Sequence, residues 1–193
     1  MIKRKDKIII AALEILEEKG VSGLTTKYLA EKQGISEPAL YRQYRNKDEI
    51  CLAMIQILSS YDDQIMNTIT QNDIIGNEAI EFYAARYGEL YQSYSELTSI
   101  LYSMDLYFYH EKTKTLIRNI LNKRNDFLTK TIEKSDLKYD ISPEQMAIWI
   151  NDLIFTEVYR WRLSDKAYDL KTVLIDRVKH MIEREAIHEN TLS

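Results

Sequence analysis

The stretch 25-TTKYLAEKQGISEPALYRQYRNKDEI-50 decides the fold of this chain, because it predicts two short helices joined by a tight turn. Thr25 is a good N-cap for the first helix, Gly34 supplies the turn, and Ser36 caps the second helix. Pro38 then lies in the first turn of that helix, where it is tolerated because the backbone N–H groups there have no partner within the helix. A helix, a short turn with a glycine and a second helix make up the helix-turn-helix arrangement.

The second helix of this stretch presents a face that suits the major groove of DNA. Leu40 is expected to anchor the helix from behind, which leaves the opposite face exposed. Such a helix fits the groove, which is about 12 Å wide, and its N-terminal residues reach the base edges. Glu37 can accept a hydrogen bond from cytosine, and Gln43 can pair with adenine. Pro38 or Ala39 can touch a thymine methyl group.

Other side chains of the stretch are better placed for DNA phosphates. Lys47 starts the next helix, where Asn46 is the expected cap and Glu49 completes a capping box, and helix N-termini favour phosphate. The alternative is that Tyr41 and Tyr44 only pack within a small helical bundle. The predicted DNA contacts are Thr26, Lys27, Ser36, Glu37, Pro38, Ala39, Tyr41, Arg42, Gln43, Tyr44, Arg45 and Lys47.

Residues 8–50 resemble the DNA-binding domain of TetR-family transcriptional regulators. The residues that carry the resemblance are Ala11, Ala12, Gly20, Thr25, Thr26, Leu29, Ala30, Gly34, Ile35, Ser36, Leu40, Tyr41, the aromatic Tyr44 and Lys47. The resemblance implies a homodimer on a palindromic operator, with a C-terminal helical domain that binds a small effector and then releases DNA. Two positions depart from the family pattern: Tyr44 replaces a usual phenylalanine, and Gln43 replaces a frequent histidine.

The rest of the chain favours an all-α protein. Only 5 Gly and 2 Pro occur in 193 residues, so turn residues are scarce and long helices with short loops are expected. We expect an N-terminal three-helix helix-turn-helix DNA-binding domain at 1–47 and a C-terminal helical effector-binding and dimerisation domain at 48–193. Helices are expected at about 6–20, 25–33, 36–44, 47–70, 78–94, 95–110, 112–134, 143–163 and 170–188.

Charge and cysteine content point to a DNA-binding protein of the cytoplasm. Residues 1–47 carry 10 Lys/Arg and 6 Asp/Glu, a net charge of +4, whereas the remainder carries 16 and 24, a net charge of −8. A basic head on an acidic body suggests a polyanion partner for the head, and the alternative is chance clustering of charges. Glu14, Glu17 and Glu18 interrupt the apolar N-terminal run, so we expect neither a signal peptide nor a membrane span. The single cysteine, Cys51, fits a reducing compartment.

Aromatic residues mark the expected effector pocket. Tyr83, Tyr87 and Tyr91 recur every four residues and so share one helical face. A cavity lined by such rings suits an apolar or aromatic ligand. The alternative is that these rings form core or subunit interface. The predicted effector-binding residues are Tyr83, Tyr87, Tyr91, Tyr102, Tyr107, Trp149 and Tyr159.

The last two helices are expected to form the homodimer interface. Both carry apolar stripes, which in a dimer can pack as a four-helix bundle, the usual interface of the family that the chain resembles. The stripes comprise Met146, Ile150, Leu153, Ile154, Val173, Leu174, Val178, Met181 and Ile182.

Two other classes of protein are alternatives to a DNA-binding repressor released by a small molecule. An enzyme is disfavoured, because the chain has no HExxH, no GxSxG and no glycine-rich phosphate loop. Glu185-x-x-His188 has the spacing of a di-iron ligand pair but occurs once. No metal, cofactor or membrane partner is therefore expected. A helical protein-interaction module without an effector is the remaining alternative.

Overall fold

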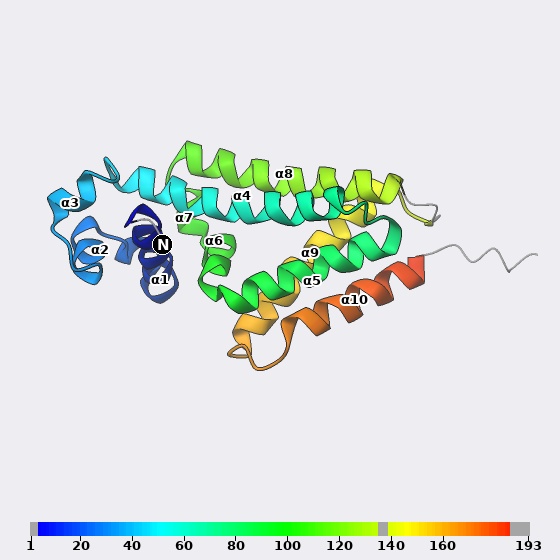
Figure 1. Ribbon diagram of the computed structural model, residues 1–193. Coiled ribbons are helices and arrows are strands. Elements are labelled where there is room, and N and C mark those ends of the chain that lie inside the picture. The colour runs from blue at the N-terminus through cyan, green and yellow to red at the C-terminus, as the bar shows by residue number, and fades with distance from the viewer. Residues whose placement is uncertain (1–3, 135–138, 186–193) are drawn as a thin grey trace, which may run out of the picture. The chain divides into compact units, whose positions relative to one another are not determined.

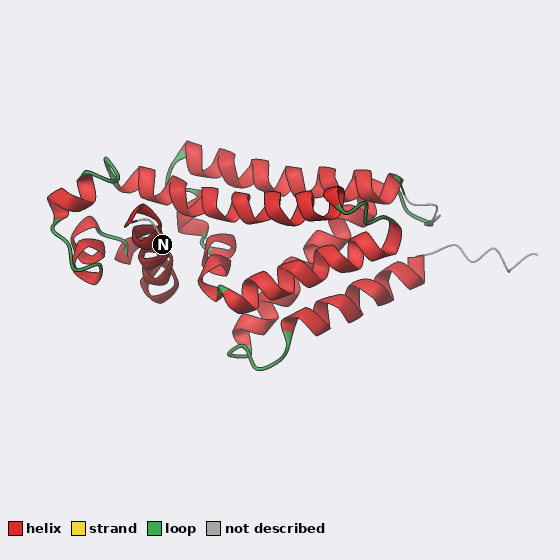
Figure 2. Ribbon diagram, viewed as in Figure 1, coloured by secondary structure: helices red, strands yellow, loops and turns green. Residues whose placement is uncertain are grey.

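Every regular element that the structure describes is a helix, which confirms the all-α prediction (Figures 1 and 2). The structure is a computed structural model, and it describes residues 4–134 and 139–185. The elements are α1 Arg4–Gly23, α2 Thr26–Lys32, α3 Glu37–Tyr41, α4 Lys47–Gln71, α5 Gly76–Ser93, the 3-10 helix η1 Ser95–Leu97, α6 Thr98–Tyr102, α7 Met104–Tyr107, α8 Glu111–Glu133, α9 Pro143–Leu163 and α10 Leu170–Glu185. Within these described ranges, no helix is both long enough and apolar enough to cross a bilayer.

The chain divides into two compact units that do not follow sequence order. Unit 1 contains Met1–Tyr61 and Tyr94–Ile120, and unit 2 contains Asp62–Ser93 and Leu121–Ser193. The helices α4 and α8 therefore each contribute residues to both units. These units are defined by contacts within the fold, not by function. The predicted division into functional domains at 1–47 and 48–193 therefore stays a prediction.

The core of unit 1 forms around α1. Ile8, Ile9, Leu13 and Leu16 recur at helical spacing and are each at most 4% exposed. The elements that pack against α1 are α2, η1, α6 and α7. Gly20 was expected to end this helix, but it instead kinks it, with φ 66° and ψ −172°, and one more turn follows. Only glycine adopts this backbone conformation without strain, so the kink depends on the residue type.

The segment 95–110 differs from the single helix that was expected there. It forms η1, α6 and α7, with a break at Ser103. Ser103 has φ −89° and ψ 89°, and its Oγ accepts a hydrogen bond from the Leu106 N–H. Serine competes with the helix by capping in this way, which physically accounts for the interruption.

Unit 2 is held together by the packing of α10 along α5 (Figure 1). At Gly88 the two backbones come so close that an added Cβ would lie 2.5 Å from the Lys171 Cα. The buried face of α10 consists of Leu170, Leu174, Val178 and Ile182.

The stripes predicted for the dimer interface are therefore only partly available to a partner. Most of their residues are buried within unit 2, and this corrects their assignment to a subunit interface. The buried members are Met146, Ile150, Ile154, Leu174, Val178 and Ile182, whereas Leu153, Val173 and Met181 remain partly exposed.

Candidate functional site

Local chemistry holds the helix-turn-helix in unit 1. The Thr25 Oγ1 accepts a hydrogen bond from the Tyr28 N–H at 3.1 Å, and the Ser36 Oγ accepts one from the Ala39 N–H at 3.3 Å. Both predicted N-caps are therefore present. Gly34 has φ 60°, the left-handed conformation that the turn between α2 and α3 requires.

Helix α3 is shorter than the sequence indicated. Its regular part ends at Tyr41, but the turn continues because the N–H groups of Gln43 and Tyr44 both donate to the Leu40 carbonyl, at 2.8 and 3.0 Å. Leu40 is fully buried and anchors the helix from behind, as expected. The residues predicted to face DNA thus lie on one short helix and the turn that follows it.

Most of the predicted DNA contacts are accessible at this surface. Exposed side chains belong to Lys27, Ser36, Pro38, Tyr41, Arg42 and Arg45. Partly exposed ones belong to Thr26, Glu37, Ala39, Gln43 and Lys47. The accessible set contains four cations and one carboxylate, a balance that favours a polyanion.

Three of these residues form a hydrogen-bonded chain that links α2 to α3. The Tyr41 hydroxyl donates to the Thr26 Oγ1 at 3.3 Å, and the Thr26 hydroxyl donates to the Glu37 Oε2 at 3.1 Å. The Glu37 carboxylate is therefore oriented by its neighbours before any base approaches it. Sequence spacing alone did not reveal this chain, because it joins residues 11 and 15 positions apart.

Tyr44 is the one predicted DNA contact that the structure contradicts. It is only 5% exposed, and its hydroxyl donates to the Lys5 carbonyl at 3.4 Å. Burial, with help from the charges of Asp6 and Glu49, raises the pKa of Tyr44 to about 12. Its ring is part of the core of unit 1, as the alternative interpretation of this tyrosine held.

Lys47 is engaged inside the protein. Its Nζ donates to the Val21 carbonyl at 2.8 Å and lies 5.1 Å from the centre of the Tyr109 ring. The Val21 carbonyl follows the kink of α1, so Lys47 ties α4 to that bend. An ammonium group has three donors. A phosphate contact by Lys47 thus has to share the group with this internal bond.

The start of α4 is capped as predicted, with one difference. The Asn46 Oδ1 accepts a hydrogen bond from the Glu49 N–H at 2.9 Å. The Glu49 carboxylate accepts a hydrogen bond from the backbone N–H of Arg45 at 2.8 Å. In a capping box it would accept from the backbone N–H of the cap residue, Asn46, which is one position later.

The predicted effector residues separate into groups. Tyr102 and Tyr107 lie in unit 1, whereas Tyr83, Tyr87, Tyr91, Trp149 and Tyr159 lie in unit 2. Trp149 and Tyr159 are 38% and 48% exposed on α9. The three tyrosines of α5 share one face, as their spacing predicted, but each is at most 1% exposed.

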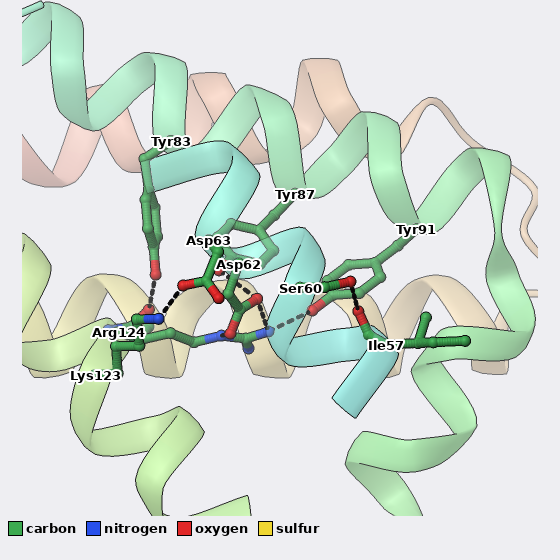
Figure 3. A network of polar contacts seen from close by, with 10 residues as sticks. Ile57, Ser60, Asp62, Asp63, Tyr83, Tyr87, Tyr91, Lys123 and Arg124 are labelled. Carbon is green, nitrogen blue, oxygen red and sulfur yellow. Dashed lines mark hydrogen bonds and ion pairs between the residues drawn. The ribbon is translucent and has the colours of Figure 1, made fainter. Parts of the chain in front are cut away.

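Tyr87 and Tyr91 bond to a buried ion pair, and Tyr83 packs against Tyr87 (Figure 3). Arg124 of α8 donates to both carboxylate oxygens of Asp62 of α4, at 2.8 and 2.7 Å. The Tyr87 hydroxyl donates to the Asp62 Oδ1 at 2.8 Å, and Arg124 also donates to the Tyr91 hydroxyl at 3.2 Å. The Arg124 guanidinium lies 4.6 Å from the centre of the Tyr87 ring. Helices α4, α5 and α8 are thus joined by polar bonds in the core of unit 2.

A second set of polar bonds extends this network to α9. The Tyr83 hydroxyl donates to the Asn151 Oδ1 at 2.9 Å, and Asn151 donates to the Asn125 Oδ1 at 2.7 Å. The rings of Tyr83 and Tyr87 meet edge to face, with centres 4.7 Å apart. Since the partners come from four helices, this cluster, here called the tyrosine network, fixes how the helices of unit 2 pack.

Burial sets the protonation of the tyrosine network. It raises the pKa values of Tyr83, Tyr87 and Tyr91, although the Arg124 charge acts in the opposite direction. Burial alone would lower the pKa of Arg124, but Tyr87, Tyr91 and Asp62 raise this pKa well above its usual value. The tyrosines are therefore neutral donors and Arg124 is a permanent cation at physiological pH.

A surface groove of about 530 Å³ lies on α9 and α10 of unit 2. Its lining includes Trp149, Leu153 and Met181 beside charged side chains of α10. Among the residues that the structure describes, no cluster of His, Cys, Asp or Glu is arranged to hold a metal ion. His188 of the Glu185-x-x-His188 spacing lies outside the described residues.

Comparison with known proteins identifies the N-terminal part of the chain. Residues 8–54 match the family described as "Bacterial regulatory proteins, tetR family". The tetracycline repressor protein class D of Escherichia coli is 36% identical over 84 residues, which cover 42% of this chain and 38% of the repressor. The chain thus matches less than half the length of that relative.

Other similarities extend along most of the chain. The fatty acid metabolism regulator protein of Bacillus subtilis is 20% identical over 169 residues, covering 85% of this chain and 86% of that protein. The solved structure of the fatty acid degradation regulator FadR from Bacillus halodurans superposes with a TM-score of 0.76 at 18% identity, covering 94% and 95% of the two chains. FadR from Bacillus subtilis, solved in complex with stearoyl-CoA, gives 0.76 at 19% identity, covering 96% and 100%. Residues 8–54 thus match the TetR family of bacterial regulatory proteins, and the fold of the described residues is similar to that of the two FadR structures.

Proposed function

We propose that this protein is a sequence-specific DNA-binding transcriptional repressor. The observation that carries the proposal is the surface of α3, where Pro38, Tyr41 and Arg42 face outward above the buried Leu40. A capped short helix exposed in this way fits the DNA major groove. The tetracycline repressor of class D is a relative in sequence, which supports repression over activation.

Within this proposal, the contacts divide into base readers and phosphate contacts. Glu37, Pro38, Ala39 and Gln43 read bases. Glu37 is the strongest candidate, because its carboxylate only accepts hydrogen bonds and so favours cytosine, whose N4 group donates. The phosphate contacts are Thr26, Lys27, Ser36, Tyr41, Arg42, Arg45 and Lys47.

Binding to the DNA upstream of the protein's own gene tests this function. We expect a shifted band in a gel assay and an affinity that falls steeply as salt rises, because each neutralised phosphate releases counterions. Arg42→Gln should weaken binding, whereas Arg118→Gln, which removes an exposed arginine of α8, should not. Failure of the unmodified chain to bind this DNA or any other duplex at low salt would refute the proposal.

The proposed effector is a small apolar or aromatic molecule that releases the DNA. FadR from Bacillus subtilis was solved with stearoyl-CoA, and FadR from Thermus thermophilus with lauroyl-CoA. These two thioesters are therefore the first ligands to test. Since Tyr83, Tyr87 and Tyr91 are fully packed, an effector that touches them has to open the tyrosine network. This requirement links ligand binding to a rearrangement of α4, α5 and α8.

Release of a bound, fluorescently labelled upstream fragment measures effector action directly. We expect anisotropy to fall on addition of a true effector, with free coenzyme A as the control for the headgroup alone. If neither thioester releases DNA, the acyl-CoA class is excluded and a screen of aromatic ligands follows. Release by free coenzyme A would contradict the apolar class.

The proposed assembly is a homodimer through α9 and α10. The outward faces of these helices carry Trp149, Leu153 and Met181 around the groove described above. A two-fold dimer presents two copies of α3, and this supports a palindromic operator.

A further inference from the structure

We propose that one strand of the operator's sugar-phosphate backbone docks into a groove on unit 1, beside α3. The groove has a volume of about 440 Å³ and is formed by the first turn of α1, the turn after α3 and one face of α4. The proposal rests on the proposed function and extends it to a surface that the sequence did not indicate. Its new contact is Lys5, a residue outside the helix-turn-helix.

The lining of the groove carries more cations than carboxylates. Lys5, Arg42 and Arg45 line the groove, and all three side chains are exposed. The one carboxylate in the lining, Glu49, is already occupied: it accepts from the Arg45 N–H at 2.8 Å and lies 3.6 Å from the Arg45 Nε. The groove therefore attracts an anion.

Part of the groove lining is apolar. Leu52 and Ala53 of α4 are partly exposed there, beside the buried ring of Tyr44. A sugar-phosphate strand matches this pattern, since its phosphate oxygens meet the cations while the C–H groups of the deoxyribose meet the apolar side chains. A free inorganic anion would meet the cations and leave the apolar side chains uncovered.

Continuity with α3 identifies the partner as duplex DNA. Tyr41, Arg42 and Gln43 belong both to the groove lining and to the surface proposed to enter the major groove. A strand that borders the major groove at α3 therefore runs directly into this groove. This assigns Arg42 and Arg45 to phosphate, so they fix position and strength of binding rather than sequence.

Two variants at Ala53 test the groove with a matched pair. Ala53→Glu places a negative charge in it, and Ala53→Gln places a neutral side chain of the same shape there. The probe is a fluorescein-labelled 30-bp duplex of arbitrary sequence, because phosphate contacts do not depend on sequence. At about 0.1 M salt, we expect Ala53→Glu to bind three- to tenfold more weakly than Ala53→Gln. The difference should shrink as salt rises.

A third variant tests Lys5 itself. Lys5→Gln should reduce the slope of log K against log salt by about 0.9 for each phosphate that the lysine neutralises. Lys112→Gln removes an exposed lysine of unit 1 outside the groove and should leave the slope unchanged. Thermal unfolding of each variant shows whether the fold is retained.

The outcomes separate the groove from the function. If the unmodified chain binds the duplex but Ala53→Glu and Ala53→Gln bind alike, the groove is wrong and the DNA-binding function stands. Equal salt slopes for Lys5→Gln and the unmodified chain would overturn the role of Lys5. Absence of any binding by the unmodified chain would refute the proposed function, and the groove with it.

Discussion

At the scale of single residues, the packing of unit 2 depends on the buried pair of Asp62 and Arg124. Both side chains are at most 8% exposed, so each loses nearly all its hydration on folding. The loss is offset only because two hydrogen bonds join them and Tyr87 and Tyr91 supply further partners. A buried pair of this kind specifies one arrangement of helices, since either charge alone in the core is strongly unfavourable.

Breaking this pair should destabilise the protein more than losing both charges. We expect Asp62→Asn to lower the free energy of unfolding by about 3–5 kcal/mol, because it leaves the Arg124 charge buried without its partner. Arg124→Met should cost about the same. The double variant should cost less than either single variant. Urea unfolding of the four proteins measures this coupling, and additive losses would show that the pair does not act as a unit.

The buried Tyr44 hydroxyl predicts a dependence of stability on high pH. In the folded protein its pKa is raised from 10.0 to about 12, so between these values only the unfolded chain loses the proton. The contribution of Tyr44 is therefore complete below pH 10 and falls as pH rises towards 12.

Tyr44→Phe removes this titration while keeping the ring. The difference in unfolding free energy between the unmodified chain and Tyr44→Phe should be constant from pH 7 to 9 and then change in favour of Tyr44→Phe. Denaturant unfolding at each pH measures it. A difference that stays constant to pH 12 would show that the hydroxyl is hydrated in the fold.

At the scale of helices, capping was predictable from sequence and the packing partner was not. Thr25, Ser36 and Asn46 cap the helices that they were expected to cap, and Ser142 caps α9 in the same way. Cap chemistry involves groups three residues apart, which a sequence displays directly. The early break at Ser103 is the exception, because a serine inside an apolar stretch is compatible with either outcome.

Periodicity indicated which faces are apolar but not what covers them. Tyr83, Tyr87 and Tyr91 share a face as predicted, yet their partners Asp62 and Arg124 are distant in sequence. In the same way, the stripes of α9 and α10 proved to be mainly the interior of unit 2. A repeat of apolar residues cannot distinguish a neighbouring helix of the same chain from one of a second copy.

The close approach of α5 and α10 makes Gly88 a position where alanine should be destabilising. A Cβ at Gly88 would lie 2.5 Å from the Lys171 Cα and 3.0 Å from the Lys171 N, and backbone atoms cannot move aside as a flexible side chain can. We expect Gly88→Ala to lower the free energy of unfolding by about 1–3 kcal/mol. Helix propensity alone predicts the opposite, a gain of about 1 kcal/mol. Thermal or urea unfolding decides between the two signs.

At the scale of the whole molecule, α4 connects the proposed DNA-binding and effector functions. It supplies Lys47 to unit 1 and Asp62 to unit 2 within one continuous hydrogen-bonded helix. A ligand that opens the tyrosine network releases Asp62 from Arg124 and so acts on this helix directly. Allosteric control requires that the ligand binds two conformations of the protein with different affinities. The intact tyrosine network defines one of these conformations.

The proposed homodimer gives the final prediction. Met181→Glu should shift the protein from dimer to monomer in sedimentation velocity, because it places a charge in the groove beside Trp149 and Leu153. Met181 is partly exposed, so the variant should retain the fold, and Asn122→Glu, an exposed site on α8, is the matched control. Affinity for an operator with two half-sites should fall by about 100-fold or more, because the second half-site no longer binds as part of the same assembly. A Met181→Glu protein that remains dimeric would place the interface elsewhere, whereas a monomer with undiminished operator affinity would contradict recognition by two linked copies of α3.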